Sequence, residues 1–368
     1  MYWYFSGFAR VNPVLLYLVF GLMGGCNSGQ INTIDTRDIP EKSGKIFQVV
    51  TPAAEEIYIL NEPIDFEIKA NQQVDIDSTI LFFEGNKIHS ESDDPLKFSF
   101  SGMLSKVGRQ SIRIKVHYND SLSQNLSLRL ILFARDKPVD LRYEVLKTIP
   151  HNRQDFTQGL FYYNGFLYEG TGRRNHSRII KTNPDNGSVL MEHRLADELF
   201  GEGITRVGDK LYQLTYQRKV GFIYALENFE KIREFDLQTM EGWGLTYDGK
   251  NLIMSDGTSV LYFYHPEYLT LSYQLDVANN RSLVNNLNEL EYARGAIWAN
   301  VYGKNHIVKI DPGSGAVVAV LDLEDLFPED IPRDYDHVLN GIAYNPDSKT
   351  YYVTGKYWPV MYEIKILE

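Results

Sequence analysis

The residues of this chain that could do chemistry together are one carboxylate and three amides, each at the start of a similar segment. They are Glu202, Gln158, Asn288 and Asn340, and a fifth segment of the same kind begins with Trp243. A carboxylate in a narrow, partly dry site has a raised pKa and can take up and release a proton near neutral pH. Amide side chains do not titrate, but they donate and accept hydrogen bonds at fixed positions. Brought together, these groups could hold an amide substrate and move one proton.

The five segments repeat one plan, which is a short apolar strand, a hairpin turn and a second strand. They begin at residues 158, 202, 243, 288 and 340 and are QGLFYYNGFLYEGTG, EGITRVGDKLYQLTY, WGLTYDGKNLIMSDG, NELEYARGAIWANVY and NGIAYNPDSKTYYVTGK. Most of the turns contain Gly, Asn or Asp, which tolerate the positive φ of tight hairpins. Their spacing of 41 to 52 residues is typical of the four-stranded blades of a β-propeller.

The number of outer strands predicts how the ring closes. SVLMEHRL, KIREFDL, LSYQLDV and AVVAVLDL follow the first four copies as fourth strands, but only MYEIKIL follows the fifth copy. The segment Tyr143–Ile149, YEVLKTI, has the outer-strand pattern and lies just before the first copy. If it completes the last blade, the ring closes without a free sheet edge. The sequence therefore predicts an all-β fold with a five-bladed β-propeller over residues 138–368.

Closure of the ring predicts where a site would lie. The first residues of the five copies would form an inner circle at one mouth of the central channel, and the last residues would lie beside them. These last residues are Gly172, Tyr216, Gly257, Tyr302 and Lys356. The inner circle could also be no more than the polar lining of a channel, so the repeat alone leaves both interpretations open.

The first 26 residues have the pattern of an export signal. The apolar run Val14–Met23 is too short for a membrane span, which needs about 20 residues. Two glycines then precede Cys26, which is the only cysteine, so no intramolecular disulfide can form. This arrangement resembles the lipobox of bacterial lipoproteins. We expect a lipid anchor on Cys26 and an exported protein on the periplasmic or cell-surface side of a membrane; an ordinary signal peptide cleaved elsewhere is the alternative.

Two segments separate this signal from the propeller. Residues 27–44 are polar and lack periodicity, which indicates a tether. Residues 45–137 contain several short strands with alternating apolar and polar residues, typical of a small immunoglobulin-like β-sandwich. We interpret this sandwich as a spacer or docking module because it shows no cluster of His, Cys or carboxylates.

The composition and the missing motifs exclude several classes of function. The net charge is −11 and no basic stripe is present, which argues against a nucleic-acid partner. The sequence has no HExxH or HxH spacing, no G-x-S-x-G motif and no Gly-rich phosphate loop. Zinc proteases, serine hydrolases and nucleotide enzymes are therefore disfavoured. We expect no required cofactor, and a structural metal ion in the channel stays open.

Motifs within and around the copies resemble those of the plant-type glutaminyl-peptide cyclotransferases. They include PHNRQDFTQGL, LYEGTG, FGEGIT, GWGLTYDGKNLIMSDG, LNELEY, LNGIAY and TGKYWP, and they span Tyr143 to about Ile364. The resemblance implies a propeller enzyme that converts the N-terminal glutamine of peptides and proteins to pyroglutamate and releases ammonia. The site positions that it implies are Phe156, Gln158, Glu202, Trp243, Asn288 and Lys356. We expect Glu202 to carry the proton, and the other residues to bind substrate.

Two aromatic residues of the expected pocket depart from the family pattern. Tyr216 and Tyr302 stand where the family usually has Trp, and Trp298 stands where it usually has Tyr. Tyrosine keeps an aromatic wall, so the expected substrate pocket includes Tyr216 and Tyr302. The departure predicts a different preference for the residue after glutamine, or slower turnover.

Two other functions stay open at this stage. A surface lipoprotein could bind peptide or glycan ends without chemistry, and it would release no ammonia. A propeller hydrolase of the lactonase type would need several carboxylates around a calcium ion, and Glu202 is the only acidic residue of the inner circle, with Asp256 near the second circle.

Overall fold

The computed structural model describes residues 45–237, 239 and 241–367. The predicted signal, its lipidation site Cys26 and the tether of residues 27–44 lie outside this range. In the described part of the chain, no helix has the length and apolar character that crossing a membrane requires.

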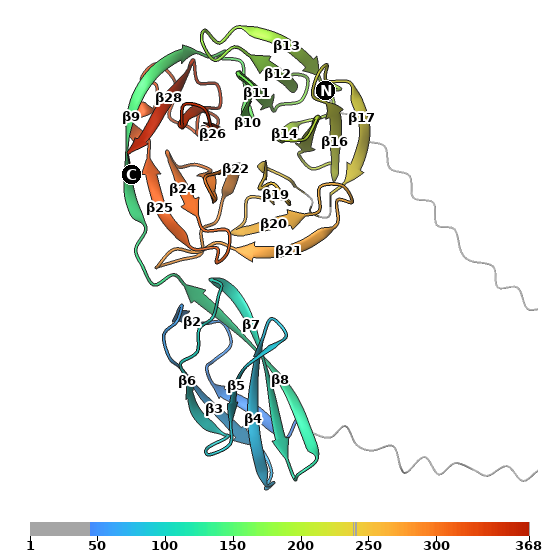
Figure 1. Ribbon diagram of the computed structural model, residues 1–368, viewed down its shortest axis with the longest axis vertical. Coiled ribbons are helices and arrows are strands. Elements are labelled where there is room, and N and C mark those ends of the chain that lie inside the picture. Colours follow the sequence, from blue (N-terminus) through green and yellow to red (C-terminus); the bar gives the residue numbers. More distant parts are fainter. Residues whose placement is uncertain (1–44, 238, 240, 368) are drawn as a thin grey trace, which may run out of the picture. The chain divides into compact units, whose positions relative to one another are not determined.

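Five blades are arranged around a common axis, with one strand of each nearest the centre (Figure 1). Three blades are separate four-stranded antiparallel sheets, and the last two are joined into one eight-stranded sheet. The innermost strands are β10 (Thr157–Tyr163), β14 (Gly201–Val207), β18 (Leu245–Tyr247), β22 (Leu287–Ala293) and β26 (Leu339–Asn345). The second strands are β11 (Phe166–Thr171), β15 (Lys210–Thr215), β19 (Leu252–Ser255), β23 (Ala296–Val301) and β27 (Thr350–Gly355). The third strands are β12 (Arg178–Thr182), β16 (Val220–Ala225), β20 (Val260–Tyr264), β24 (His306–Ile310) and β28 (Val360–Leu367).

The outer strands show how the ring closes. They are β13 (Val189–Arg194), β17 (Lys231–Asp236), β21 (Leu271–Asp276), β25 (Val317–Asp322) and, for the last blade, β9 (Val139–Pro150). β9 pairs antiparallel with β28 from Arg142 to Pro150, and its first residues also pair parallel with β25. The prediction of five blades closed by an upstream strand is therefore confirmed. The 3₁₀ turn η2 (Glu324–Leu326) follows β25 and opens the connection to β26.

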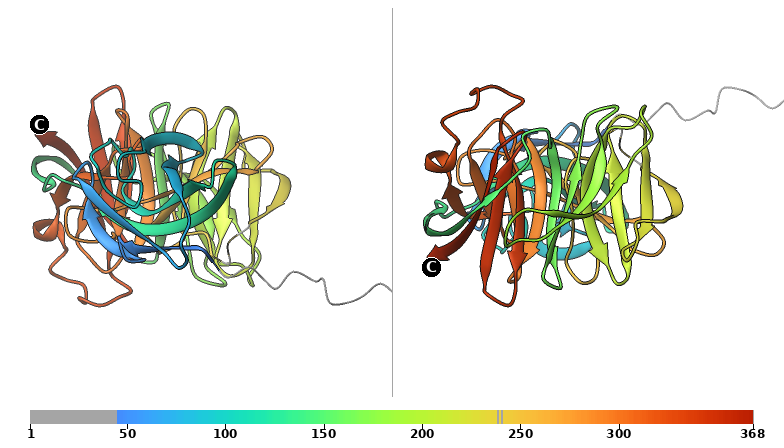
Figure 2. Two further views of the ribbon diagram at one scale, coloured as in Figure 1. Left: turned by 90° about the horizontal axis from the view of Figure 1, so that it is seen from below. Right: turned by 90° about the horizontal axis from the view of Figure 1, so that it is seen from above.

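The blades are held by apolar contacts between their faces. In Figure 2 the strands run along the ring axis, so their connecting loops gather at the two ends of the ring. The inner three strands of each blade are mostly buried, as an inner sheet packed on both faces must be. Clusters of buried aliphatic and aromatic side chains fill the space between neighbouring blades. The burial of this apolar surface is the main favourable term in forming the ring.

Glycine allows the innermost strands to approach one another closely. A Cβ atom on Gly203 would lie 2.6 Å from the backbone of both Trp243 and Leu245, and one on Gly244 would lie 2.0 Å from the carbonyl oxygen of Asn288. Both glycines directly follow the first residue of a copy. The side chains of these first residues consequently converge on a narrow axis.

Residues 45–133 form two sheets around a separate core. The strands of the smaller sheet are, in order, β1 (Phe47–Thr51), β3 (Ile64–Ala70) and β6 (Lys97–Phe100). Those of the larger sheet are β2 (Glu56–Ile59), β8 (Leu122–Phe133), β7 (Gly108–Tyr118), β4 (Ile76–Phe83) and β5 (Asn86–Glu91). β2 and β5 lack a buried alternating face, which is the sequence signal of a half-buried strand. Assignment of these sheets to the immunoglobulin-like class stays a prediction.

Candidate active site

All eight residues predicted for the site line one pocket of about 290 Å³, which opens beside the innermost strands of the ring. They are Phe156, Gln158, Glu202, Tyr216, Trp243, Asn288, Tyr302 and Lys356. Their chemical roles are not tested by this geometry. Three further residues line the pocket that the sequence analysis did not name, and they are Arg173, Phe200 and Asp336.

A regular hydrogen-bond pattern brings the two predicted circles together. In four of the five copies, the last residue donates its backbone N–H to the carbonyl of the residue two places before the start of that copy, as Gly172 does to Phe156 and Tyr216 does to Phe200. Lys356 donates in the same way to Val338. Phe200 therefore takes in the second copy the place that Phe156 has in the first, and the repeat could have predicted it.

A chain of amide hydrogen bonds fixes the orientation of Gln158. Asn340 donates from Nδ2 to the carbonyl oxygen of Thr157 at 2.8 Å and to Oε1 of Gln158 at 3.3 Å. With its oxygen turned towards Asn340, Gln158 has its amide nitrogen on the other side, and its interaction with Glu202 lowers the pKa of that carboxyl group. Asn340 does not line the pocket itself but orients Gln158, which does.

Glu202 is the buried acid of the pocket, and its side chain is 3% exposed. Burial raises its pKa well above the ordinary value, and the charge of Glu241 adds to this, whereas Lys356 and Gln158 oppose it. Its Oε2 atom has no hydrogen-bond partner among the described residues. This oxygen is itself buried, so its hydrogen-bonding capacity is unused within the described residues.

Lys356 supplies the buried base opposite this acid. Burial lowers its pKa to about 8, although the neighbouring Glu202 favours the charged form. Its Nζ atom lies 4.5 Å from the ring centre of Phe156 and 5.2 Å from that of Tyr302, which are cation–π distances. The ammonium group is therefore held between polar and aromatic neighbours instead of being fully solvated.

Aromatic rings form the walls of the pocket. Phe156 packs edge-to-face against Phe200, with ring centres 6.0 Å apart, and Phe200 packs against Tyr216 at 5.5 Å. On another side, Trp243 and Tyr302 pack edge-to-face at 5.7 Å. Nε1 of Trp243 also donates to Glu241 at 3.1 Å, which fixes the indole plane. These walls can exclude water and contact an aliphatic chain.

A second buried carboxyl group ties the innermost strands together next to Asn288, which lines the pocket. In the fourth copy, Glu289 stands where the other copies have glycine, and it is 0% exposed. Its two carboxyl oxygens accept backbone N–H groups from Leu160 at 3.1 Å and Ile342 at 2.8 Å, which belong to two other blades. Burial raises the pKa of Glu289 well above its ordinary value. This second carboxyl group, which the sequence analysis missed, ties three blades together.

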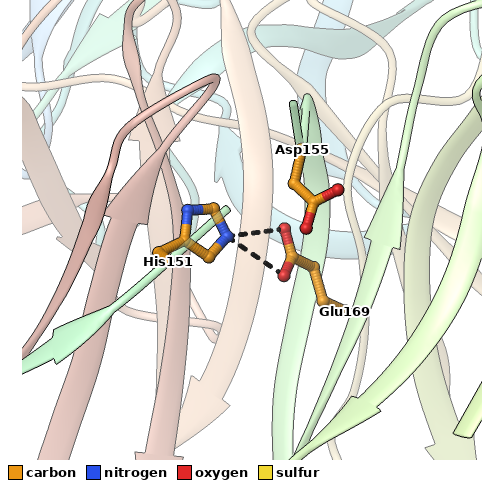
Figure 3. Close-up of side chains that lie close together, drawn as sticks. All are labelled: His151, Asp155 and Glu169. Carbon is orange, nitrogen blue, oxygen red and sulfur yellow. Dashed lines mark hydrogen bonds and ion pairs between the residues drawn. The ribbon is translucent and has the colours of Figure 1, made fainter. Parts of the chain in front are cut away.

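His151, Asp155 and Glu169 form a cluster of charged side chains with little exposure (Figure 3). His151 contacts both oxygens of Glu169 from Nε2, at 3.1 and 3.2 Å, and bonds the carbonyl of Trp358 from Nδ1 at 2.7 Å. Burial opposes a charge on His151, but Glu169 raises its pKa to about 9. Asp155, the third residue of the cluster, is paired with Arg178.

The donor types of this cluster occur in metal sites, but here they already have cationic partners. His151, Asp155 and Glu169 could each offer one ligand atom within 4.8 Å of the others. An imidazolium ring and a guanidinium group neutralise the two carboxylates, so a metal ion would have to displace both. The cluster instead belongs to the link between the segment before Phe156 and the turn after Lys356, where the backbone carbonyl of Asp155 accepts the backbone N–H of Tyr357 at 2.8 Å.

Fold and site together define a class of protein: a five-bladed β-propeller with one buried acid, one buried base and ordered amides in a pocket beside the innermost strands. A family model described as glutamine cyclotransferase matches residues 121–366. The chain is 38% identical over 227 residues to a glutaminyl-peptide cyclotransferase of Arabidopsis thaliana, covering 61% of this chain and 71% of that protein. The solved structure of glutaminyl cyclase from Myxococcus xanthus has 32% identity and a TM-score of 0.59, covering 62% of this chain and 98% of that one.

The chain belongs to the glutamine cyclotransferase family. The resemblance noted in the sequence is therefore confirmed, and with it the propeller fold of this region.

Proposed function

We propose that this protein catalyses the family's reaction in the described pocket, converting the N-terminal glutamine of a peptide to pyroglutamate with release of ammonia. The observation that supports this most directly is the state of Glu202. It is a buried carboxyl group with one oxygen free of partners in the described chain, beside amides that are already ordered. A substrate amide and amine can complete those hydrogen bonds.

The reaction forms one bond and breaks another within the same residue. The α-amine nitrogen attacks the side-chain amide carbon, and the bond from that carbon to the amide nitrogen then breaks. The proton lost by the amine ends on the departing nitrogen, which leaves as ammonia. Because the two reacting groups are tethered, the enzyme chiefly has to fold the substrate and carry the proton.

Glu202 carries that proton in this scheme. As a carboxylate it takes a proton from the substrate's α-amine, and as a carboxylic acid it returns this proton to the leaving nitrogen. Its raised pKa suits both steps near neutral pH. No metal ion is needed for this transfer.

The other residues of the pocket hold the substrate. Gln158 and Asn288 hydrogen bond the side-chain amide and the α-amine, and Lys356 stabilises the negative charge that develops on the amide oxygen. The aromatic walls pack against the two methylene groups of the glutamine chain and keep water out. They comprise Phe156, Tyr216, Trp243 and Tyr302, together with Phe200.

We also propose that the enzyme is exported and held at a membrane through a lipid on Cys26. The sequence pattern before this cysteine supports the proposal. Mass analysis of the N-terminal fragment from the membrane fraction would detect the lipid. The same fragment with a free N-terminus at another residue would contradict it.

The deciding experiment is incubation of the protein with a Gln-initiated peptide, followed by mass spectrometry. The expected product has lost the mass of one ammonia molecule and has a blocked N-terminus. Glu202→Gln is expected to lower kcat by about 10²–10⁴-fold, the usual contribution of a general acid–base group. Circular dichroism should show that the variant is folded. Binding of the peptide by wild-type protein without ammonia release would favour the alternative, a propeller that binds peptide or glycan ends without chemistry.

A further inference from the structure

The longest interval of the repeat ends in a loop that borders the pocket. This loop, residues 328–338, follows η2 and precedes β26, and it is held in place by several contacts. Tyr302 donates from its hydroxyl group to the carbonyl of Tyr335 at 2.9 Å, and Trp358 donates from Nε1 to the carbonyl of His337 at 3.2 Å. The side chain that the loop places on the pocket is Asp336. The extra length of the fourth interval therefore builds one side of the mouth.

Arg173 meets this loop from the first blade. It forms an ion pair with Asp336, and its guanidinium carbon lies 4.1 Å from the ring centre of Phe156. Arg173 has a φ of 81°, a left-handed backbone conformation that is uncommon for a residue with a long side chain. Such conformations persist where the surrounding structure holds them, and they cluster at functional sites.

The pocket has a buried interior and an exposed rim. Glu202 and Lys356 are 3% and 4% exposed, whereas the side chains of Arg173 and Asp336 are 35% and 56% exposed. A glutamine whose amine and amide lie at Glu202 can continue into a peptide only through the open end. The residue after the glutamine therefore passes the Arg173–Asp336 pair.

We propose that this rim pair selects the residue that follows the N-terminal glutamine and that it favours a basic side chain. The inference rests on the proposed function and adds a subsite to it. The carboxylate is the more exposed member of the pair, and a carboxylate can accept bonds from a second cation beside Arg173.

The surroundings of the rim pair add to the preference. Asp334 on the same loop is a further exposed carboxylate, paired with His337. Lys356 is the other cation of the pocket, and it is buried against Phe156. An acidic residue after the glutamine would be repelled by the exposed carboxylates, whereas a lysine or arginine would form ion pairs with them.

The test compares three short peptides that begin Gln-Lys, Gln-Glu and Gln-Ala. For the wild-type protein, kcat/KM is expected to be about twofold to fivefold higher for Gln-Lys than for Gln-Glu, the effect of partly exposed charge pairs. Asp336→Asn is expected to bring this ratio close to one, mainly through KM, because the rim binds the substrate and does not touch the reacting atoms. The ratio of the wild-type protein should also shrink at high salt.

Asp330→Asn is the matched control. Asp330 lies on the same loop and is paired with Arg153, but it does not line the pocket. This variant loses the same charge and should keep the wild-type ratio. A ratio that is equal in the wild-type protein and in Asp336→Asn, or that falls equally in both variants, would overturn the rim assignment alone. If the wild-type protein converts none of the three peptides, the proposed function fails, and this subsite fails with it.

Discussion

Asn340 offers a way to disturb Glu202 without touching it. Asn340→Asp keeps the shape of the side chain but places an oxygen where Nδ2 now donates to Thr157 and Gln158. An ionised carboxylate cannot donate a hydrogen bond. Gln158 is therefore expected to turn its amide, directing its nitrogen to residue 340 and its oxygen to Glu202. Glu202 then loses the donor that stabilises its charge.

The size of the effect follows from the lost hydrogen bond. A hydrogen bond to a charged group contributes about 1.5–3 kcal/mol. One pKa unit corresponds to about 1.4 kcal/mol, so the pKa of Glu202 should rise by about one to two further units in the variant. At a pH below this new pKa, the fraction of Glu202 that can accept a proton falls about tenfold to hundredfold. Ammonia release from a Gln-initiated peptide, followed from about pH 5 to about pH 9, should show the acid limb of kcat displaced to higher pH.

Asn300→Asp provides the control for burying an acid in this region. Asn300 is 0% exposed, and its Oδ1 accepts the backbone N–H of Gly341 at 3.1 Å. Its Nδ2 has no partner in the described part of the chain, so the aspartate keeps the hydrogen bond that matters. This variant should lose stability without moving the acid limb. The reasoning is refuted if Asn340→Asp is folded and active with the acid limb of the wild-type protein.

Three further predictions follow from the buried charges and from the packing at the axis. The pH profile of kcat should be bell-shaped, because activity falls as pH drops through the raised pKa of Glu202 and falls again above about pH 8 as Lys356 loses its proton. Lys356→Arg should move the alkaline limb to higher pH. An unmoved alkaline limb would show that another group causes it. His151→Gln should destabilise the protein by about 3–5 kcal/mol near pH 6. Because the pKa of His151 is raised from 6.5 to about 9, its stabilisation is complete below 6.5 and disappears as pH rises through 9, so thermal unfolding should show a smaller difference between wild type and variant at pH 9 than at pH 6. Gly244→Ala should prevent correct closure of the propeller ring, since its Cβ would lie 2.0 Å from a backbone oxygen. Gly249→Ala is the control: it lies at a hairpin turn where a Cβ meets nothing within 4 Å, so it reports the cost of positive φ alone. Equal unfolding temperatures for the two variants would contradict the role given to close packing.

Much of the site could be predicted because residues at equivalent positions of the five copies meet at the axis of the ring, however far apart they are in the sequence. Gln158 and Asn340 are far apart in sequence, yet both begin an innermost strand, and ring closure places them 3.3 Å apart at their side-chain atoms. The same rule would have identified Phe200 from Phe156. It could not identify Arg173 or Asp336, because one follows the end of a copy and the other lies in a loop of irregular length.

By itself, the sequence determined the number of blades, the closing strand and the residue types at the mouth, since hairpin periodicity and turn chemistry are local properties of the chain. The tertiary structure decided which oxygen of Glu202 is free, which way the amide of Gln158 points, and that Glu289 is used to tie blades together. It also decided that Asp336 meets Arg173 at the rim. These features depend on contacts between blades, where burial and hydrogen-bond partners come from segments that no local pattern connects.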